Sequence, residues 1–145
     1  LSENVWKEVE KMLEQIQKYP QKEEYQKLVE ADRINLYERE AEKGDDRKFL
    51  EETDRVFKEN LKGDPAWKLY ERKLVYLESK QPDISGEFER FLKKYPKVMD
   101  AYVEYSIYLC RNNKMTQAQR VYREGRKQTG MTSKRAEELR RKLGL

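Results

Sequence analysis

Basic side chains gather at the C-terminal end of the sequence. Residues 111–145 carry 11 basic and 3 acidic side chains, whereas residues 1–63 carry 13 basic and 17 acidic ones. Such a cluster can neutralise phosphates, which gives salt-dependent binding without sequence preference, or it can bind an acidic protein. A solvated basic face is the third interpretation, because few aromatic side chains that could stack on bases lie nearby. The candidate residues for RNA or acidic-partner binding are Arg123, Arg126, Lys127, Lys134, Arg135, Arg140, Arg141 and Lys142, and Arg120 extends the cluster.

Catalytic and metal-binding chemistry lacks its usual side chains in this sequence. There is no histidine, which removes the most common general base and metal ligand. One cysteine cannot form a zinc site of the usual kind, and the six glycines form neither a dinucleotide-binding nor a phosphate-loop motif. Acidic pairs such as Glu51 with Glu52 occur, but no pattern brings them into a dry pocket. We therefore expect no catalytic, metal or cofactor-binding residue and a protein that is not an enzyme.

Three further side chains have chemistry that packing alone can also explain. Cys110 follows an apolar helical stretch, which predicts a small buried residue, with a reactive thiol as the alternative. Trp67 falls at a bulky position of a repeat, which indicates a packing residue rather than an anchor for a partner. Trp6 lies on the first helix, where contact with something outside this chain stays open.

Composition limits the class of protein. Charged residues make up 41% and apolar residues 37%, which is typical of long solvated helices with one apolar stripe each. No apolar run reaches the roughly 18 residues that a membrane span needs. A single cysteine and the lack of a glycosylation sequon favour a reducing, intracellular compartment. Because the sequence begins with Leu1, we expect it to be a piece of something longer.

The segments that must position these side chains form helical pairs, of which residues 66–96 and 97–130 are two copies. Trp67 and Tyr102 are 35 residues apart, and Phe88 and Tyr122 are 34 apart. Apolar residues recur at helical spacing in both halves of each copy. A period of this length is typical of stacked helical hairpins, so the sequence predicts an all-α fold with about eight helices.

The rest of the chain continues this pattern. Residues 2–18 form an amphipathic helix that stops at Tyr19 and Pro20, in the same phase as the helix that stops at Pro96. Helices are also expected over residues 22–43 and from 45 or 46 to about 62, the latter closed by Gly63, Asp64 and Pro65. A final helix begins at Thr132 or Ser133. We predict a single domain, 1–145, with a half repeat at 1–20, repeats at 21–65, 66–96 and 97–130, and a capping helix at 131–145.

The order of bulky and small residues in the last copy follows a known repeat pattern. It is carried by Tyr102, Tyr105, Ser106, Leu109, Ala118, Tyr122 and Gly125, and it resembles tetratricopeptide repeats. The second helices, with Phe88-Glu-Arg-Phe-Leu92 and Arg120-Val-Tyr-Arg-Glu-Gly125, are more similar to half-a-TPR (HAT) repeats. This resemblance implies a right-handed solenoid of antiparallel helix pairs.

The resemblance also implies a function and a partner-binding groove. HAT proteins serve as scaffolds in RNA-processing machines, which implies a protein-interaction module, nuclear rather than cytoplasmic, and possible homodimers. The tetratricopeptide groove would be lined by Lys68, Arg72, Tyr76 and Arg111, which departs from the pattern that clamps a peptide carboxylate and disfavours a chaperone adaptor. A protein partner, as a peptide or helix segment in this groove, is the leading interpretation. Direct binding of RNA by the basic C-terminal end is the alternative.

Overall fold

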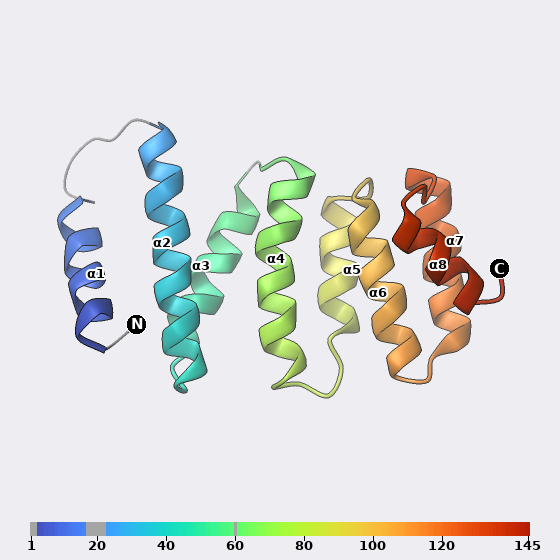
Figure 1. Ribbon diagram of the computed structural model, residues 1–145, viewed down its shortest axis with the longest axis horizontal. Coiled ribbons are helices and arrows are strands. Elements are labelled where there is room, and N and C mark those ends of the chain that lie inside the picture. The colour runs from blue at the N-terminus through green and yellow to red at the C-terminus, as the bar shows by residue number, and fades with distance from the viewer. Residues whose placement is uncertain (1–2, 17–22, 60) are drawn as a thin grey trace. The chain divides into compact units, whose positions relative to one another are not determined.

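Helices make up all of the regular structure in the described part of the chain. The computed structural model describes residues 3–16, 23–59 and 61–145, and no strand occurs in these ranges (Figure 1). The all-α prediction is therefore confirmed for them. The helices are α1 (Glu3–Ile16), α2 (Glu23–Glu42), α3 (Arg47–Lys58), α4 (Gly63–Glu78), α5 (Ser85–Lys94), α6 (Met99–Arg111), α7 (Met115–Thr129) and α8 (Lys134–Lys142).

The chain divides into two compact units, which are described separately. The first unit is Leu1–Glu59 with α1 to α3, and the second is Asn60–Leu145 with α4 to α8. The repeat boundaries at residues 20, 65, 96 and 130 stay a prediction. The stop expected at Tyr19 and Pro20 lies outside the described residues.

In the first unit, α2 packs against both α1 and α3. Leu13 is the buried residue of α1, and Phe49, Val56 and Phe57 are the buried apolar residues of α3. Phe49 and Val56 lie two helical turns apart, so α3 turns one apolar face inward, and Ile34, Leu36 and Ala41 are the buried apolar residues of α2. Hydrophobic burial along α2 therefore holds this unit together.

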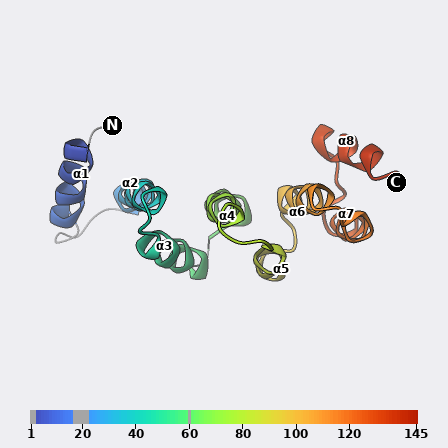
Figure 2. The same ribbon diagram turned by 90° about the horizontal axis from the view of Figure 1, so that it is seen from below.

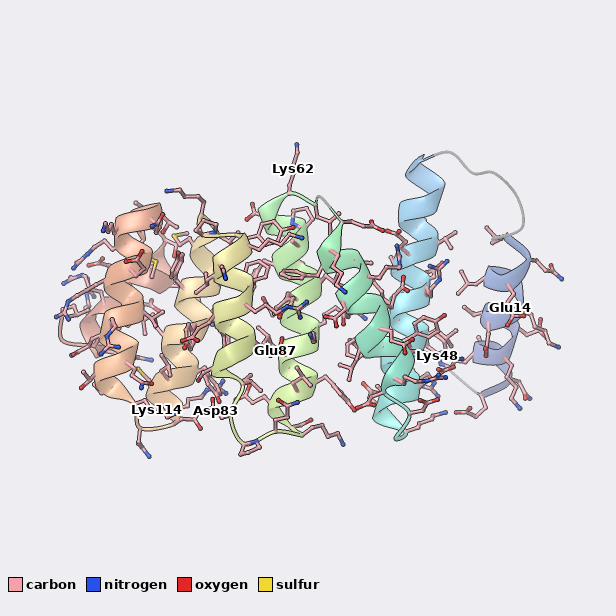
Figure 3. The ribbon with its side chains drawn as sticks, turned by 180° about the vertical axis from the view of Figure 1, so that it is seen from behind. Glu14, Lys48, Lys62, Asp83, Glu87 and Lys114 are labelled. Atoms are coloured by element: carbon pink, nitrogen blue, oxygen red, sulfur yellow. The ribbon has the colours of Figure 1, made fainter. Side chains whose placement is uncertain are left out.

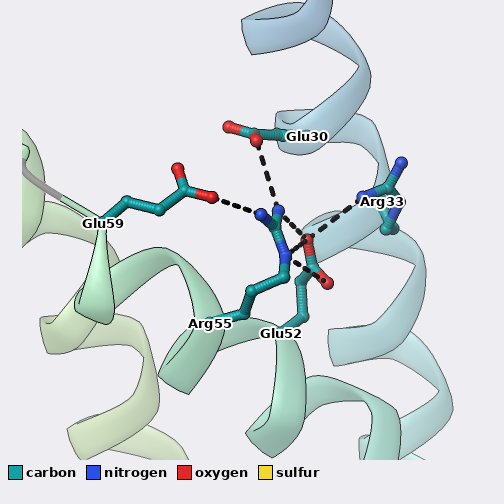
Figure 4. Close-up of polar contacts among 5 residues, drawn as sticks. All are labelled: Glu30, Arg33, Glu52, Arg55 and Glu59. Carbon is teal, nitrogen blue, oxygen red and sulfur yellow. Dashed lines mark hydrogen bonds and ion pairs between the residues drawn. The ribbon is translucent and has the colours of Figure 1, made fainter.

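A cluster of charged side chains also joins α2 to α3 (Figure 4). Arg55 donates hydrogen bonds to Glu52, at 2.6 Å from Nη2 to Oε1, and to Glu30 at 3.2 Å. Arg55 also donates to Glu59, and Arg33 donates to Glu52 at 3.3 Å. Burial alone raises the pKa of Glu52, but the hydrogen bonds and charges of Arg55 and Arg33 outweigh burial and lower it. Glu52 is therefore held as a carboxylate between two guanidinium groups.

The second unit has an aromatic core between α4, α5 and α6. The Trp67 ring lies 5.1 Å from the Phe91 ring, and the Phe88 ring stacks on Tyr105 at 4.8 Å. Trp67 is 3% exposed, so its predicted role in packing is confirmed. Such ring pairs contribute about 0.5–1.5 kcal/mol each beyond the burial of their area. This core fixes α5 against the two helices on either side of it in sequence.

A partly buried ion pair joins α4 to α5 beside this core. Lys73 is 4% exposed, and its ammonium donates to Glu87 at 3.2 Å. The same carboxylate accepts a hydrogen bond from the Tyr70 hydroxyl. Burial, and then the hydrogen bond to Glu87, raise the pKa of Tyr70 well above its usual value. The half-buried carboxylate of Glu87 thus gives the buried Lys73 ammonium an ion-pair partner, which offsets the cost of its burial.

Helices α6 and α7 approach each other closely at Gly125. A Cβ atom added there would lie 2.7 Å from Cβ of Tyr102, so only glycine fits without a shift of the backbone. Tyr122 and Ala118 are buried on the same side of α7. The helix ends at Gly130, whose φ of +84° is the left-handed conformation that commonly terminates helices. The helix end expected near Gly130 is confirmed.

Helix α8 follows and packs against α6. Ser133 is its N-cap, and the Ser133 hydroxyl accepts a hydrogen bond from the Ala136 amide, as predicted. Ala136, Leu139 and Leu143 are buried, and Gln119 of α7 donates to the carbonyl of Leu143 at 2.8 Å. The narrow apolar stripe of α8 therefore faces the preceding hairpin.

Two predicted helix ends differ from the structure. Gly63, Asp64 and Pro65 do not close α3, which ends at Lys58, but form the first turn of α4. Proline suits a first turn because the missing N–H has no partner there in any helix. Gly63 is required by a close approach, since a Cβ at this residue would lie 2.7 Å from Val98 Cγ2. At the start of α3, Asp46 is the N-cap residue, but its side chain makes no capping hydrogen bond.

Candidate functional site

The predicted first-helix groove residues lie on α4 and at the end of α6. Lys68 is exposed on α4, and Arg72 and Tyr76 follow it at intervals of four residues and are half-buried. Lys80 lies over the Tyr76 ring at 5.9 Å. Arg111 forms an ion pair of 2.9 Å with Glu78, which brings the C-terminal ends of α6 and α4 together. The Arg111 charge is therefore compensated within the chain.

The predicted basic residues at the C-terminal end divide between different surfaces. Arg123 and Lys127 line one side of α7, as their spacing of four residues predicts. The Arg126 guanidinium instead lies over the ring of Tyr122 at 5.7 Å. The remaining residues, Lys134, Arg135, Arg140, Arg141 and Lys142, are on α8. They thus lie on a different helix from Arg123 and Lys127.

Part of the positive charge of α8 is compensated by nearby carboxylates and carbonyls. Arg135 pairs with Glu104 of α6. Arg140 donates to Glu137 at 2.6 Å and to the carbonyl of Leu145. The hydrogen bond from Arg140 lowers the pKa of Glu137. Lys134, Arg141 and Lys142 are exposed and leave α8 with a solvated basic face.

A groove lies between α5 and α7 in the second unit. It has a volume of about 920 Å³, and α6 forms its floor through Tyr102 and Tyr105. Leu92 of α5 and Val121 of α7, both half-buried, contribute apolar walls. In Figure 2, α5 and α7 lie on the same side of α6. We call this hollow the α5/α7 groove.

The α5/α7 groove continues into a smaller hollow of about 240 Å³ at the N-terminal ends of α5 and α7. Ser85 and Gln117 line it, and Glu89, Tyr105, Arg120 and Val121 line both hollows. Asp83 and Lys114, which are 3.9 Å apart, mark this end (Figure 3). The opposite end is lined by Pro96 after α5 and Gln128 of α7, so α5 and α7 run parallel along the groove.

Positive charge on the larger hollow exceeds negative charge. Its cations are Lys93, Arg120, Arg123 and Lys127, and its carboxylates are Glu89 and Glu124. Glu89 accepts a hydrogen bond of 3.0 Å from the Tyr105 hydroxyl, and Glu124 accepts one of 3.1 Å from Gln128. Within the described parts of the chain, none of the four cations has an ion-pair or hydrogen-bond partner. The groove thus combines apolar walls with uncompensated positive charge.

The tyrosines of the floor have satisfied hydroxyl groups. Tyr102 donates to the carbonyl of Pro96 at 2.8 Å, and Tyr105 donates to Glu89. Burial, followed by the hydrogen bond to Glu89, raises the pKa of Tyr105 to about 12. Both rings are therefore anchored at their polar ends.

Sequence reasoning did not predict this groove, although two signals for it are present. Arg120, Arg123 and Lys127 stand at i, i+3 and i+7, which places them on one helix face. Val121 and Leu92 are apolar but lie beside the buried stripes of their helices rather than within them. Apolar residues next to a basic stripe indicate a surface that can bind a partner.

Cys110 and Trp6 have ordinary environments. Cys110 is half-buried rather than buried, and burial raises the pKa of its thiol, which disfavours the reactive thiolate. The half-buried Trp6 ring lies 5.2 Å from the Arg39 guanidinium of α2. With Leu36 it lines a hollow of about 180 Å³ within the first unit. Contact of Trp6 with a second molecule stays a prediction.

Comparisons with family models, with curated proteins and with solved structures found no match to this chain. Within the described ranges, no helix has the length and apolar character needed to span a bilayer. The described cysteine and acidic side chains form no group of three or more that could hold a metal ion.

Proposed function

We propose that this protein is a non-catalytic scaffold that binds another protein, built as a right-handed solenoid of antiparallel helix pairs. The observation that carries this proposal is the α5/α7 groove, which is apolar, about 920 Å³ in volume and bordered by cations without partners in the described residues. Surfaces that combine apolar area with a polar rim are typical of protein interfaces.

Packing by residues at corresponding positions of two successive hairpins supports the solenoid. Trp67 of α4 packs on Phe88 and Phe91 of α5, and Tyr102 of α6 packs against Gly125 of α7. Helix α8, the first element after these hairpins, packs on α6. A repeated unit of this kind leaves its outer faces free for binding.

The setting of the scaffold follows from the resemblance to HAT repeats. We place it within an RNA-processing or ribonucleoprotein complex in the nucleus, with a protein as its direct partner. The exposed first-helix side chain of Lys68, with Arg72 and Tyr76, offers a second surface for the same assembly.

Direct binding of RNA is the alternative, and the exposed cations Lys134, Arg141 and Lys142 of α8 favour it. Against it, Arg135 and Arg140 are already paired with Glu104 and Glu137. Tyr122, the aromatic residue closest in sequence to this basic set, is 1% exposed and offers no face on which a base can stack. The protein-binding interpretation therefore has more support.

Purification of the tagged protein with its bound partners, with and without ribonuclease, tests the proposal. We expect a protein partner that survives ribonuclease treatment and that forms a complex of defined stoichiometry when both proteins are purified and mixed. The RNA alternative is tested in parallel by fluorescence anisotropy of a labelled unstructured RNA at low and physiological salt. Binding only to RNA, with a steep loss of affinity as salt rises, would replace the scaffold by the alternative.

A further inference from the structure

We infer that the α5/α7 groove binds one amphipathic α-helix of a partner protein, with aliphatic side chains on its buried face and carboxylates on the flanks of that face. The inference rests on the proposed scaffold function and specifies the site and the chemistry of the partner. It concerns the side of the second unit formed by α5 and α7, not the first-helix surface of Lys68, Arg72 and Tyr76.

The helical walls of the groove favour a helical partner segment over an extended one. Both walls and the floor are α-helices, whose interior N–H and C=O groups already bond to one another. An extended segment would find no free main-chain edge here on which to form a ladder. A helix brings its own backbone hydrogen bonds and offers only side chains, which is what the groove can receive.

The apolar residues of the walls and floor favour aliphatic side chains on the buried face of that helix. Leu92, Val121 and the Tyr102 and Tyr105 rings line the groove between its two walls. Aliphatic side chains at i, i+3, i+4 and i+7 of a helix form a stripe that matches a groove of this kind. The α5 wall has 10 residues and the α7 wall has 15, so three to four turns of a helix, about 15–22 Å, can lie along them.

The positive charges on the rim of the groove favour acidic side chains beside the aliphatic stripe of the partner helix. Arg120, Arg123 and Lys127 form a row along α7, and Lys93 lies on α5 across the groove. The two carboxylates of the groove are engaged by Tyr105 and Gln128. A partner helix with glutamate or aspartate beside its aliphatic stripe would pair with both rims, whereas lysine or arginine there would be repelled.

Nucleic acid fits the same charges less well. Tyr102 and Tyr105 are 3% and 5% exposed, so their faces are unavailable for stacking on bases. Glu89 and Glu124 would also lie beside a phosphate backbone. The apolar walls would then remain in contact with water or with polar groups. An acidic amphipathic helix is the occupant that uses both the apolar and the cationic parts of the groove.

The test uses three labelled helical peptides of about 20 residues, titrated with the whole protein and followed by fluorescence anisotropy. The first has a leucine stripe with glutamate flanks, the second has the same stripe with lysine flanks, and the third has the composition of the first in scrambled order. We expect the acidic amphipathic peptide to bind at least tenfold more tightly than either of the others.

Charge-reversal variants locate the binding. Arg123 and Lys127 are exposed, so Arg123→Glu with Lys127→Glu should leave the fold unchanged, as circular dichroism will verify. We expect this double variant to weaken binding of the acidic peptide at least tenfold. Lys134→Glu with Lys142→Glu makes the same change in charge on α8, outside the groove, and should weaken binding less than threefold.

Four results of these binding experiments would overturn the inference. Equal binding of the glutamate-flanked and lysine-flanked peptides would show that the charges of the groove do not select the partner. Equal losses of affinity in both double variants would show that the peptide does not bind in the groove. Failure of the acidic peptide to bind, or its displacement by an unstructured RNA from a groove that binds the RNA more tightly, would remove the helical occupant. If a purified partner still binds, unaffected by Arg123→Glu with Lys127→Glu, the scaffold function survives and only the groove assignment is wrong.

Discussion

Glu52 contributes to the first unit through its charge. Its pKa is lowered because Arg55 and Arg33 outweigh the opposing effect of burial. A carboxyl group whose folded pKa lies below its ordinary value of 4.5 contributes stability that is present above that pH. The contribution is lost as the pH falls through the lower, folded pKa. Acidification should therefore weaken the contact between α2 and α3.

We predict that Glu52→Gln destabilises the first unit by about 1–3 kcal/mol at neutral pH, because the guanidinium groups of Arg55 and Arg33 lose their charged, buried acceptor. Hydrogen exchange of the α3 amides measures the change locally. The difference between wild type and variant should shrink at a pH below the folded pKa of Glu52, where both side chains are neutral. An unchanged difference at acidic pH would contradict the ionic role of Glu52.

Tyr105 provides the corresponding test at alkaline pH. Its pKa is raised from 10.0 to about 12, first by burial and then by its hydrogen bond to Glu89. Stability from the neutral hydroxyl is fully present below pH 10 and is lost as the pH rises towards 12. We predict that Tyr105→Phe loses less unfolding free energy than wild type over this interval, as measured by urea denaturation. Parallel losses in both proteins would show that other groups control alkaline unfolding.

Single residues also show what the sequence can predict. Trp67 and Tyr122 were assigned to the core from spacing alone, and both are buried, because position on a helical stripe determines burial. Cys110 was expected to be buried but is only half-buried at the end of α6. Exposure at a helix end depends on what packs over that end, which spacing along the helix does not contain.

The closest contact between two helices limits how near they can pack. For α6 and α7 that contact is Gly125 against Tyr102. We predict that Gly125→Ala destabilises the second unit by about 1–3 kcal/mol, because overpacking outweighs the helix propensity of alanine. Thermal denaturation followed by circular dichroism measures the effect.

Gly86→Ala is the matched control for this prediction. Gly86 is an exposed residue of α5, and a Cβ there would meet nothing within 4 Å. This substitution should be neutral or stabilising by up to about 1 kcal/mol. Equal destabilisation by both substitutions would mean that close packing at Tyr102 is not the cause.

Helix ends were harder to predict than helices. Ser133 and Gly130 act at their expected positions, because their capping chemistry is local. Gly63 and Pro65 were expected to close one helix and instead open the next. Glycine followed by proline fits the end of one helix as well as the start of the next. The close approach of Gly63 to Val98 depends on a residue 35 positions further along, which the local sequence pattern does not contain.

At the scale of the molecule, the second unit contains a complete core of its own. Trp67, Phe88, Phe91 and Tyr105 all lie within Asn60–Leu145. We predict that a fragment of residues 60–145 folds alone, with a helical circular dichroism spectrum and one cooperative thermal transition. A fragment that melts gradually, without a transition, would show that this core needs the first unit.

The candidate site could be predicted only in part. The shared helix face of Arg123 and Lys127 follows from their spacing in the sequence. The position of Lys93 and Leu92 across the groove does not follow from the sequence. It depends on how the side chains of Tyr102 and Tyr105 fill the space between α5 and α7. The division of the basic residues between α7 and α8 likewise depends on the packing of α8 against α6.

The parallel course of α5 and α7 gives the groove an electrical polarity. Both helices begin at the end marked by Asp83 and Lys114 and finish at the end lined by Pro96 and Gln128. Their partial positive charges therefore coincide at the first end and their partial negative charges at the second. A helix bound between them is favoured with its own C-terminus at the first end, running antiparallel to both walls. The groove thus distinguishes the chain direction of its partner.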